Sequence, residues 1–414
     1  MKPIRLIFAS AGLAAALLPP AQAVEFATDI RPLLEVNCVK CHGADKQKGD
    51  LRLDELGLAE KGGETGPALA KGDPAGSLLL KRISLAADHD DIMPPKGGPL
   101  KPAQIETLRQ WIADGATWPG GVTLRAKSAA DLEREKLFAA KPLKSIEVFP
   151  GKVTLETAAD SHTLVAMATY GDDSTRDITG DAVFRLAKPG IAELRGNQLL
   201  PSADGETQVH VSFGGHELVV PIKVIDAAKP RRVSFRLDVM PIFLRAGCNT
   251  GSCHGSARGQ DGFMLSLFGY DPDGDHHRIT RQLSTRRLNL ALASESLLIE
   301  KPTEAVPHTG GKQIDVGSPY YNTLVRWIED GAPNDPKDVV KPLNIEILPP
   351  KLLLEGDGAT QQMTVVARYS NGTDRDVTSL VVFQSNNDNS AMVSPEGTVT
   401  AKNRGEAFVT ARFA

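Results

Sequence analysis

The stretch "NCVKCHG", residues 37 to 43, places Cys38, Cys41 and His42 in the order Cys-x-x-Cys-His. Two cysteines three positions apart lie about one helical turn from each other, and the next residue can turn its imidazole over the same face. Both sulfurs can then form thioethers to the vinyl groups of a haem while the histidine ligates the iron. A redox dithiol, half of a zinc site or a disulfide are the alternatives, but no βαβ context and no second ligand pair accompany the motif. We therefore predict covalent haem at these three residues.

A second cluster, "GCNTGSCHG" at residues 247 to 255, has four residues between Cys248 and Cys253 and also ends in Cys-His. Five positions along a regular helix turn by roughly 140°, so the two sulfurs diverge unless the backbone loops out. The "NTG" segment between them is turn-prone and can supply such a loop. Two structures remain open: a second haem on Cys248, Cys253 and His254, or a disulfide between the two cysteines without a haem.

The second axial ligand of each iron must come from elsewhere in the sequence. In "DDIMPPKGGPL", residues 90 to 100, Met93 lies on a proline-stiffened loop from which a thioether can reach a buried iron. Aligning "MPPKGG" with "VPHTGG" puts Val306 at the place of that methionine, and His308 is then the natural replacement. Loop methionines often only fill gaps, and loop histidines are often only solvated. We predict Met93 for the first site and His308 for the second, which would then have the lower reduction potential.

Self-comparison shows that the chain is a tandem repeat of two modules. The first repeat pairs "LRQWIADGATWP" (108 to 119) with "LVRWIEDGAPND" (324 to 335), in the same order as the two cysteine clusters. The second pairs "TYGDDSTRDITGDAVF" (169 to 184) with "RYSNGTDRDVTSLVVF" (368 to 383), at a constant offset of 199. The two kinds of module therefore alternate along the chain.

The two modules have different hydrophobic periods. Apolar residues at 105, 108, 111 and 112 form a helical stripe in the segment between Pro102 and Gly115, and a matching stripe occupies 320 to 328. The other module alternates polar and apolar residues, as in "HTLVAMATY" (162 to 170) and "QMTVVARY" (362 to 369), which predicts short strands of an antiparallel sandwich. A short charged helix is expected at 128 to 140.

Residues 25 to 120, with "IRPLLEVNCVKCHG", "GDPAGSLLLKRI", "MPPKG" and "LRQWIADGA", resemble the planctomycete-type cytochrome c domain. The strand-rich modules resemble the group 2 bacterial Ig-like domain through "RDIT", "RDVT" and "GTVTAKNRGEAFVTA" (397 to 411). The resemblances imply a helical haem domain that transfers single electrons and a sandwich that serves as spacer or adhesive surface. The second cysteine cluster departs from the family pattern by its longer spacing.

The expected fold class is multidomain, α plus all-β, with two small helical cytochrome c-like domains alternating with two Ig-like β-sandwiches. The second sandwich is expected to be incomplete, because the sequence stops before the strand that matches "GGHELVVPIKV"; an exposed sheet edge and a longer parent protein would follow. The expected ranges are a signal peptide (1–23), cytochrome c-like domain 1 (24–120), a linker (121–142), Ig-like domain 1 (143–226), cytochrome c-like domain 2 (231–338) and a truncated Ig-like domain 2 (343–414).

The N-terminal residues indicate export. Lys2 and Arg5, an apolar run and the small residues Ala21-Gln22-Ala23 have the layout of a secretory signal peptide, and no later segment approaches the roughly 18 apolar residues of a membrane span. A net charge of -4, with 47 basic and 51 acidic residues and no long basic block, gives no case for nucleic-acid binding. We expect a periplasmic, secreted or cell-surface protein.

The remaining motifs do not indicate catalysis, so we expect no enzyme. In "YDPDGDHHR" (270 to 278) the glycine lies at the fourth rather than the sixth position of a calcium loop, which leaves a solvated turn with His276 and His277 as reserve iron ligands. The leading hypothesis is an exported dihaem cytochrome with haem c at both sites, exchanging electrons with redox partner proteins. The alternative is a surface scaffold whose Ig-like modules bind cell wall or polysaccharide and whose haem domains are structural.

Overall fold

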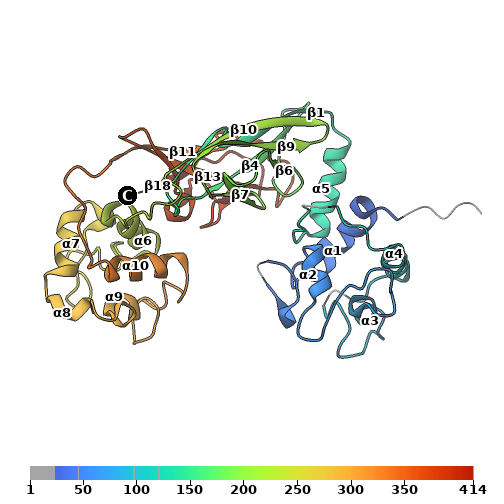
Figure 1. Cartoon of the computed structure of the whole chain (residues 1–414), viewed down its shortest axis with the longest axis horizontal. Coiled ribbons are helices and arrows are strands. Elements are labelled where there is room, and N and C mark those ends of the chain that lie inside the picture. Colours follow the sequence, from blue (N-terminus) through green and yellow to red (C-terminus); the bar gives the residue numbers. More distant parts are fainter. Residues whose placement is uncertain (1–23, 45, 97, 120–121, 414) are drawn as a thin grey trace, which may run out of the picture. The chain divides into compact units, whose positions relative to one another are not determined.

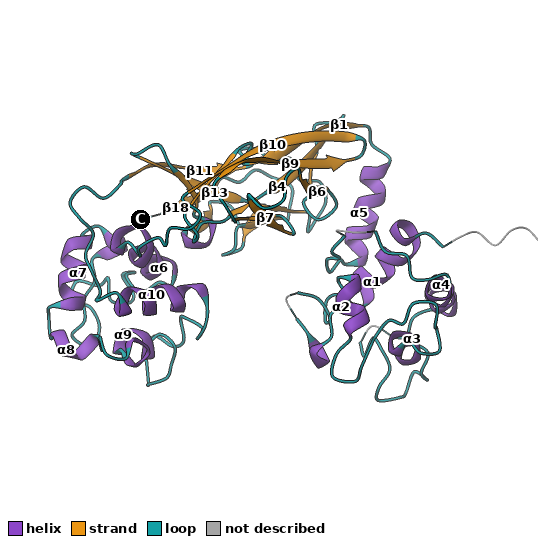
Figure 2. Cartoon of the chain, in the orientation of Figure 1, coloured by secondary structure: helices purple, strands orange, loops and turns teal. Residues whose placement is uncertain are grey.

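The computed structural model describes residues 24–44, 46–96, 98–119 and 122–413 (Figure 1). The chain separates into two compact units, Met1–Ala129 and Ala130–Ala414. Regular structure in the described part of the first unit is helical, whereas the second contains both helices and strands (Figure 2). The predicted signal peptide at 1–23 lies outside the described residues. Among the helices that the structure does describe, none is long and apolar enough to cross a membrane.

The first unit is built around the helix predicted between Pro102 and Gly115. This helix, α4, starts at Pro102, where the missing N–H costs nothing, and its apolar stripe is buried as the sequence predicts. The ring of Trp111 lies 6.1 Å from that of Phe26, and its indole Nε1 donates to the carbonyl of Thr117 at 3.0 Å. The elements of the unit are η1 (Phe26–Ile30), α1 (Arg31–Asn37), η2 (Lys48–Asp50), α2 (Leu56–Lys61), α3 (Leu78–Ile83) and α4 (Pro102–Ala113).

The helical part of the second unit repeats this arrangement. Trp327 lies 5.3 Å from Phe235 between ring centroids, and its Nε1 donates to the carbonyl of Pro333 at 3.0 Å. The same aromatic pair and the same indole hydrogen bond therefore occur in both sequence repeats. The helices are α5 (Ala129–Ala139), which is the expected charged helix, then η3 (Phe235–Val239), α6 (Met240–Arg245), η4 (Leu267–Gly269), α7 (Pro272–Thr280), α8 (Ser284–Arg287), η5 (Ala293–Glu295), α9 (Leu297–Glu300) and α10 (Pro319–Glu329).

Most of the segment 270–278 belongs to α7 (Pro272–Thr280), so the expectation of a solvated turn is wrong. Asp271 caps α7 by accepting a hydrogen bond from the backbone N–H of Gly274 at 3.0 Å. Asp275 is fully buried and accepts hydrogen bonds from the backbone and hydroxyl of Ser266 and from Arg278. The same local sequence suits a carboxylate that is buried with a complete set of hydrogen-bond donors and one that is exposed in a polar turn. The sequence alone does not distinguish the two, which explains the error.

The strands that follow α5 form three small sheets, in the orders β1-β4-β5, β2-β10-β9-β6 and β3-β8-β7. Leu155 in β2 and Leu199 in β8 are fully buried, as is Ile178 directly after β5. The strands are β1 (Leu143–Phe149), β2 (Val153–Glu156), β3 (His162–Thr163), β4 (Val165–Tyr170), β5 (Thr175–Asp177), β6 (Val183–Leu186), β7 (Ala192–Arg195), β8 (Gln198–Pro201), β9 (Gly205–Phe213) and β10 (His216–Ile225).

The last strands repeat part of this topology in the same register. Ile146 pairs with Ala168 in the β1-β4 ladder, and Ile345 pairs with Ala367 at the offset of 199 that the sequence predicts. Among the described strands β18 pairs only with β15. The elements are β11 (Pro342–Leu348), β12 (Thr360–Gln362), β13 (Thr364–Tyr369), β14 (Asp374–Asp376), η6 (Thr378–Leu380), β15 (Val382–Ser385), β16 (Ala391–Val393), β17 (Thr398–Ala401) and β18 (Val409–Arg412).

A buried carboxylate joins separate parts of the second unit. Asp238 in η3 accepts hydrogen bonds from Arg231, in the segment before η3, at 3.1 Å and from Arg375 in β14 at 3.0 Å. Arg231 also lies 3.5 Å from Asp160, which follows β2. Buried charges are tolerated only when they are paired and hydrogen-bonded, so these contacts bind the helices of the second unit to both groups of strands.

Candidate functional site

The first cysteine cluster forms a single tight turn at the end of α1. The backbone N–H groups of Cys41 and His42 both donate to the carbonyl of Cys38, at 3.1 and 3.0 Å. A Cβ atom on Gly43 would lie 2.6 Å from the carbonyl oxygen of Val39, so the turn closes only with glycine at this position. The structure therefore brings the three predicted residues into one turn.

The electrostatics of this turn favour neutral groups. Burial, with a smaller contribution from Cys41, raises the pKa of the Cys38 thiol to about 12. Burial also lowers the pKa of His42, against the opposing effect of the backbone at Lys48 and Leu51. Nδ1 of His42 is buried and has no hydrogen-bond partner among the described residues. A neutral imidazole is the form that binds a metal, so His42 is suited to that role.

Met93 lies on the loop between α3 and α4, where its backbone N–H donates to the carbonyl of Arg82 at 3.2 Å. Its half-buried side chain packs against the same apolar cluster as Cys38, a cluster that includes Leu34 and Leu80. The structure therefore brings Met93 to the core that also holds the cysteine turn.

The second cluster keeps the backbone framework of the first. His254 N–H donates to the carbonyl of Cys248 at 3.0 Å, as His42 does to that of Cys38. The carbonyl of His254 accepts from Leu265 N–H at 2.8 Å, and the carbonyl of His42 accepts from Leu53 N–H at 2.7 Å. The cysteine-to-histidine hydrogen bond is thus preserved although the second cluster is two residues longer.

The two additional residues are accommodated by a loop. The N–H groups of Cys253 and Gly255 both donate to the carbonyl of Thr250 at 3.0 Å, and the Thr250 hydroxyl donates to the carbonyl of Gly247 at 2.8 Å. This is the loop that the sequence predicts. The side chain of Asn249 is fully buried, and its amide has no hydrogen-bond partner within the described part of the chain.

No disulfide joins any of the four cysteines in the structure. Burial, followed by the effect of Cys253, raises the pKa of Cys248 to about 12, the value that Cys38 also has. The first cysteine of each cluster therefore lies in the same kind of environment, against the apolar core of its helices.

The structure places the ring of His308 beside that of His254. The two rings are parallel to within 11° and their centroids are 6.4 Å apart. Nδ1 of His254 lies 3.0 Å from the carbonyl oxygen of Phe263, and Nδ1 of His308 lies 2.8 Å from that of Gly311. Because a carbonyl can only accept, Nδ1 carries the hydrogen in both rings, which leaves Nε2 as the nitrogen that a neutral imidazole would use to bind a metal.

This arrangement has the features of a bis-histidine metal site. Two imidazoles that bind one metal from opposite sides through Nε2, at about 2.0–2.1 Å each, hold their ring centroids about 6 Å apart. A backbone acceptor for the other ring nitrogen is the usual partner of a metal-bound histidine. Burial lowers the pKa of His254, and His308 adds to that effect, so the imidazole is held neutral. In ring separation and in the backbone partner of each Nδ1, the two histidines therefore fit a shared metal.

The reserve ligands do not join this site. His276 Nε2 lies 2.9 Å from the carbonyl oxygen of Ala332, and its ring packs edge-on against Phe235, so it belongs to the core. His277 is exposed. Within the described residues, no group of three or more His, Cys, Asp or Glu side chains is arranged to hold a metal ion.

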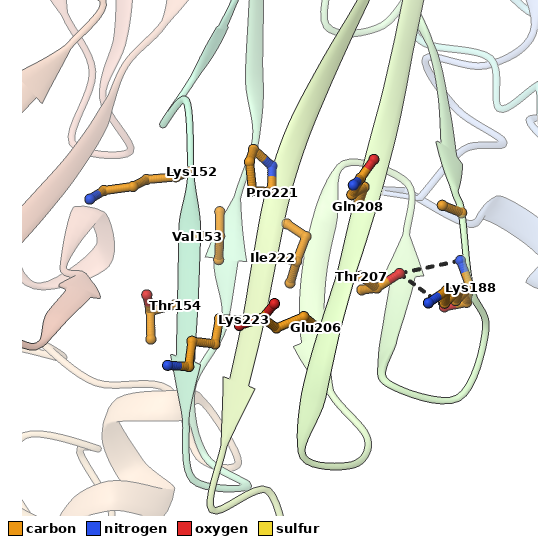
Figure 3. Close-up of a pocket in the computed structure, with 11 residues that line it drawn as sticks. Lys152, Val153, Thr154, Lys188, Glu206, Thr207, Gln208, Pro221, Ile222 and Lys223 are labelled. Atoms are coloured by element: carbon orange, nitrogen blue, oxygen red, sulfur yellow. Dashed lines mark hydrogen bonds between the residues drawn. The ribbon is translucent and has the colours of Figure 1, made fainter.

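A separate hollow of about 560 Å³ lies on the sheet that contains β2, β9 and β10 (Figure 3). Its lining includes Lys152, Lys188, Lys223 and Glu206, and no predicted site residue. Lys152 and Lys188 lie at opposite ends of the hollow (Figure 3). The Thr207 hydroxyl is bonded to the backbone of Lys188, so it is not free for a ligand.

Two family models match the chain. Residues 38–97 match the model of planctomycete cytochrome C, and residues 344–412 match that of the bacterial Ig-like domain (group 2). The chain thus contains a cytochrome c-like domain and an Ig-like domain, together with mixed helical and β content in several small sheets. The cytochrome match covers Cys38, Cys41, His42 and Met93 and indicates haem c as the cofactor.

Further comparisons give little similarity. No curated protein matches the sequence. Domains 4 and 5 of the S-layer protein SbsC are 15% identical over 25% of this chain and 57% of that chain, with a TM-score of 0.18. Domains 5–6 of the same protein are 12% identical over 66% of this chain and 92% of that chain, with a TM-score of 0.26. The chain therefore spans just over half the length of the first of these structures.

Proposed function

We propose that this chain is an exported c-type cytochrome with two haems that exchanges single electrons with redox partner proteins. Two cytochrome c-like domains, 24–120 and 231–338, alternate with Ig-like spacers at 143–226 and 343–414. The observation that carries the proposal is the parallel pair of imidazoles, His254 and His308, beside the second cysteine pair. No catalytic role is proposed.

The two sites would hold their haems by different ligands. Cys38 and Cys41 would attach the first haem, with His42 and Met93 as axial ligands. Cys248 and Cys253 would attach the second, with His254 and His308. Haem iron supplies one-electron redox chemistry, and a thioether ligand raises its potential relative to a second imidazole. Electrons would therefore pass downhill from the second site to the first.

The decisive experiment counts haems on protein exported in a host with haem-attachment machinery. We expect the intact mass to show two covalent haems, and a pyridine-haem spectrum to give the same number. Replacing Cys248 and Cys253 by Ala should leave one haem, and replacing Cys38 and Cys41 should leave the other. One haem in the unaltered chain would refute the second site, and colourless protein would refute the proposal.

A second function is favoured by the hollow on the β sheet. Lys152, Lys188 and Lys223 have no ion-pair partner among the described residues, and they lie around a surface with enough room for a sugar unit. We propose that this surface binds an anionic polysaccharide. Alginate should bind in a titration while neutral dextran should not, and Lys152→Glu with Lys223→Glu should abolish binding. Equal binding of the double variant would exclude this surface.

A further inference from the structure

Arg287, the last residue of α8, is a buried cation. Its side chain donates to the backbone carbonyls of Arg278 and Gly262, each at 3.1 Å, and of Gln282, and the residue is 7% exposed. Throughout the described residues, no carboxylate lies within ion-pair distance of it. Burying an unneutralised charge costs free energy, so the fold retains this arginine against a penalty that an apolar residue would avoid.

The ring of Phe263 contacts both the Arg287 guanidinium and the second site. Its Cζ lies 4.6 Å from the centroid of the Phe263 ring, in a cation–π contact. The same ring lies 4.8 Å from the ring of His254, and the Phe263 carbonyl accepts the hydrogen bond from His254 Nδ1. The two separations place the cation within 9.4 Å of the His254 ring centroid.

Each of these contacts restrains the imidazole. Gly262 carbonyl and the Phe263 ring are both held by Arg287, so the peptide that orients His254 is fixed at two adjacent positions. A positive charge at this distance also disfavours the more oxidised, more positive state of any metal that His254 binds. The neighbouring Arg286 is exposed and has neither contact, which separates the effect of Arg287 from that of general surface charge.

We propose that Arg287 is a positioning residue of the second haem site, which orients His254 through Phe263 and raises the reduction potential of the metal bound there. This inference rests on the proposed function of His254. It adds a charge effect that opposes the potential-lowering effect of two imidazole ligands.

The test is carried out on the full chain with Cys38 and Cys41 replaced by Ala, so that only the second haem contributes. Arg287→Met removes the charge and keeps an unbranched apolar side chain; Arg287→Lys keeps the charge and loses the planar fork. Arg286→Gln is the matched control. Midpoint potentials come from spectroelectrochemistry, and imidazole orientation from the electron paramagnetic resonance of the oxidised haem.

We expect Arg287→Met to lower the potential, changing the electron-exchange equilibrium with a mediator by about tenfold, as for a unit charge about 10 Å away at an effective dielectric constant of about 20. Arg287→Lys should alter the resonance spectrum with a smaller change in potential. Arg286→Gln should change neither.

An unchanged potential in Arg287→Met, or an equal change in Arg286→Gln, would overturn the charge effect. If the Met variant does not fold, a wild-type resonance spectrum in Arg287→Lys would overturn the positioning role, and an altered one would support it. Absence of the second haem from the unaltered chain would instead refute the proposed function.

Discussion

The glycine that follows the second Cys-His pair gives the sharpest structural prediction. A Cβ atom on Gly255 would lie 2.1 Å from the carbonyl oxygen of Asn249 and 2.7 Å from that of Thr250. Close carbon–oxygen contacts in proteins are about 3.3 Å, so Gly255→Ala must move the two backbone segments apart by about 1 Å. The position has no left-handed φ, so the whole effect is steric.

The cost of Gly255→Ala can be estimated from the hydrogen bonds that share this backbone. Separation breaks the bond from Gly255 N–H to Thr250 and weakens that from His254 N–H to Cys248, at about 1 kcal/mol each. Overpacking adds about 1–3 kcal/mol. We therefore expect a loss of about 3–5 kcal/mol in the local stability of the loop.

Gly251, in the same loop, provides the matched control. A Cβ atom there would have only the Leu267 side chain nearby, at 3.8 Å, so Gly251→Ala should change stability by less than about 1 kcal/mol. Hydrogen exchange across residues 247–256 and the haem count by mass spectrometry measure both variants. We expect Gly255→Ala to lose protection and the second haem while Gly251→Ala keeps both. Equal behaviour of the two variants would refute the reasoning.

Other substitutions and conditions test the remaining features. Met93→Ala should change the visible spectrum and lower the potential of the first haem; spectra identical to wild type in both redox states would remove Met93 from that site. Asp275→Asn should destabilise α7 by about 3 kcal/mol in hydrogen exchange because it disrupts a buried ion pair, whereas Asp273→Asn, at the exposed end of the helix, should cost less than about 1 kcal/mol; similar losses would contradict this. In haem-free protein, Cys38 with a pKa of about 12 stays a thiol until the pH approaches that value, so at pH 8 its iodoacetamide alkylation should be about 1000-fold slower than that of a thiol at the ordinary value of 9.0. Peptide mass spectrometry measures the reaction, and rapid alkylation of Cys38 at pH 8 would disprove its burial.

Elements in which apolar residues recur at a regular spacing, or which are repeated along the chain, could be predicted from the sequence. The stripe at 105 to 112 gave the bounds of α4 because proline and glycine mark its two ends. The offset of 199 gave the register of β11 and β13, since repeated strands keep their hydrophobic face. The loop in the second cysteine cluster was also predictable, because two sulfurs on opposite sides of a helix require it.

Residues whose roles depend on distant partners could not be predicted. Asp275 is buried because Ser266 and Arg278 satisfy it, and Asn249 is buried although its sequence is typical of an exposed turn. The sequence made His276 a reserve iron ligand, but in the structure its Nε2 is hydrogen-bonded to the carbonyl of Ala332, 56 positions away. Arg287 carried no sequence signal, because its partners are backbone carbonyls and a ring rather than acidic side chains.

The shared carboxylate of Asp238 limits how the parts of this chain can be exchanged in evolution. A recombination event that replaced the last strands by those of another protein would remove Arg375. The buried carboxylate of Asp238 would then lose one of its cationic partners. Here the helices around the second cysteine pair and both neighbouring groups of strands would have to be inherited together.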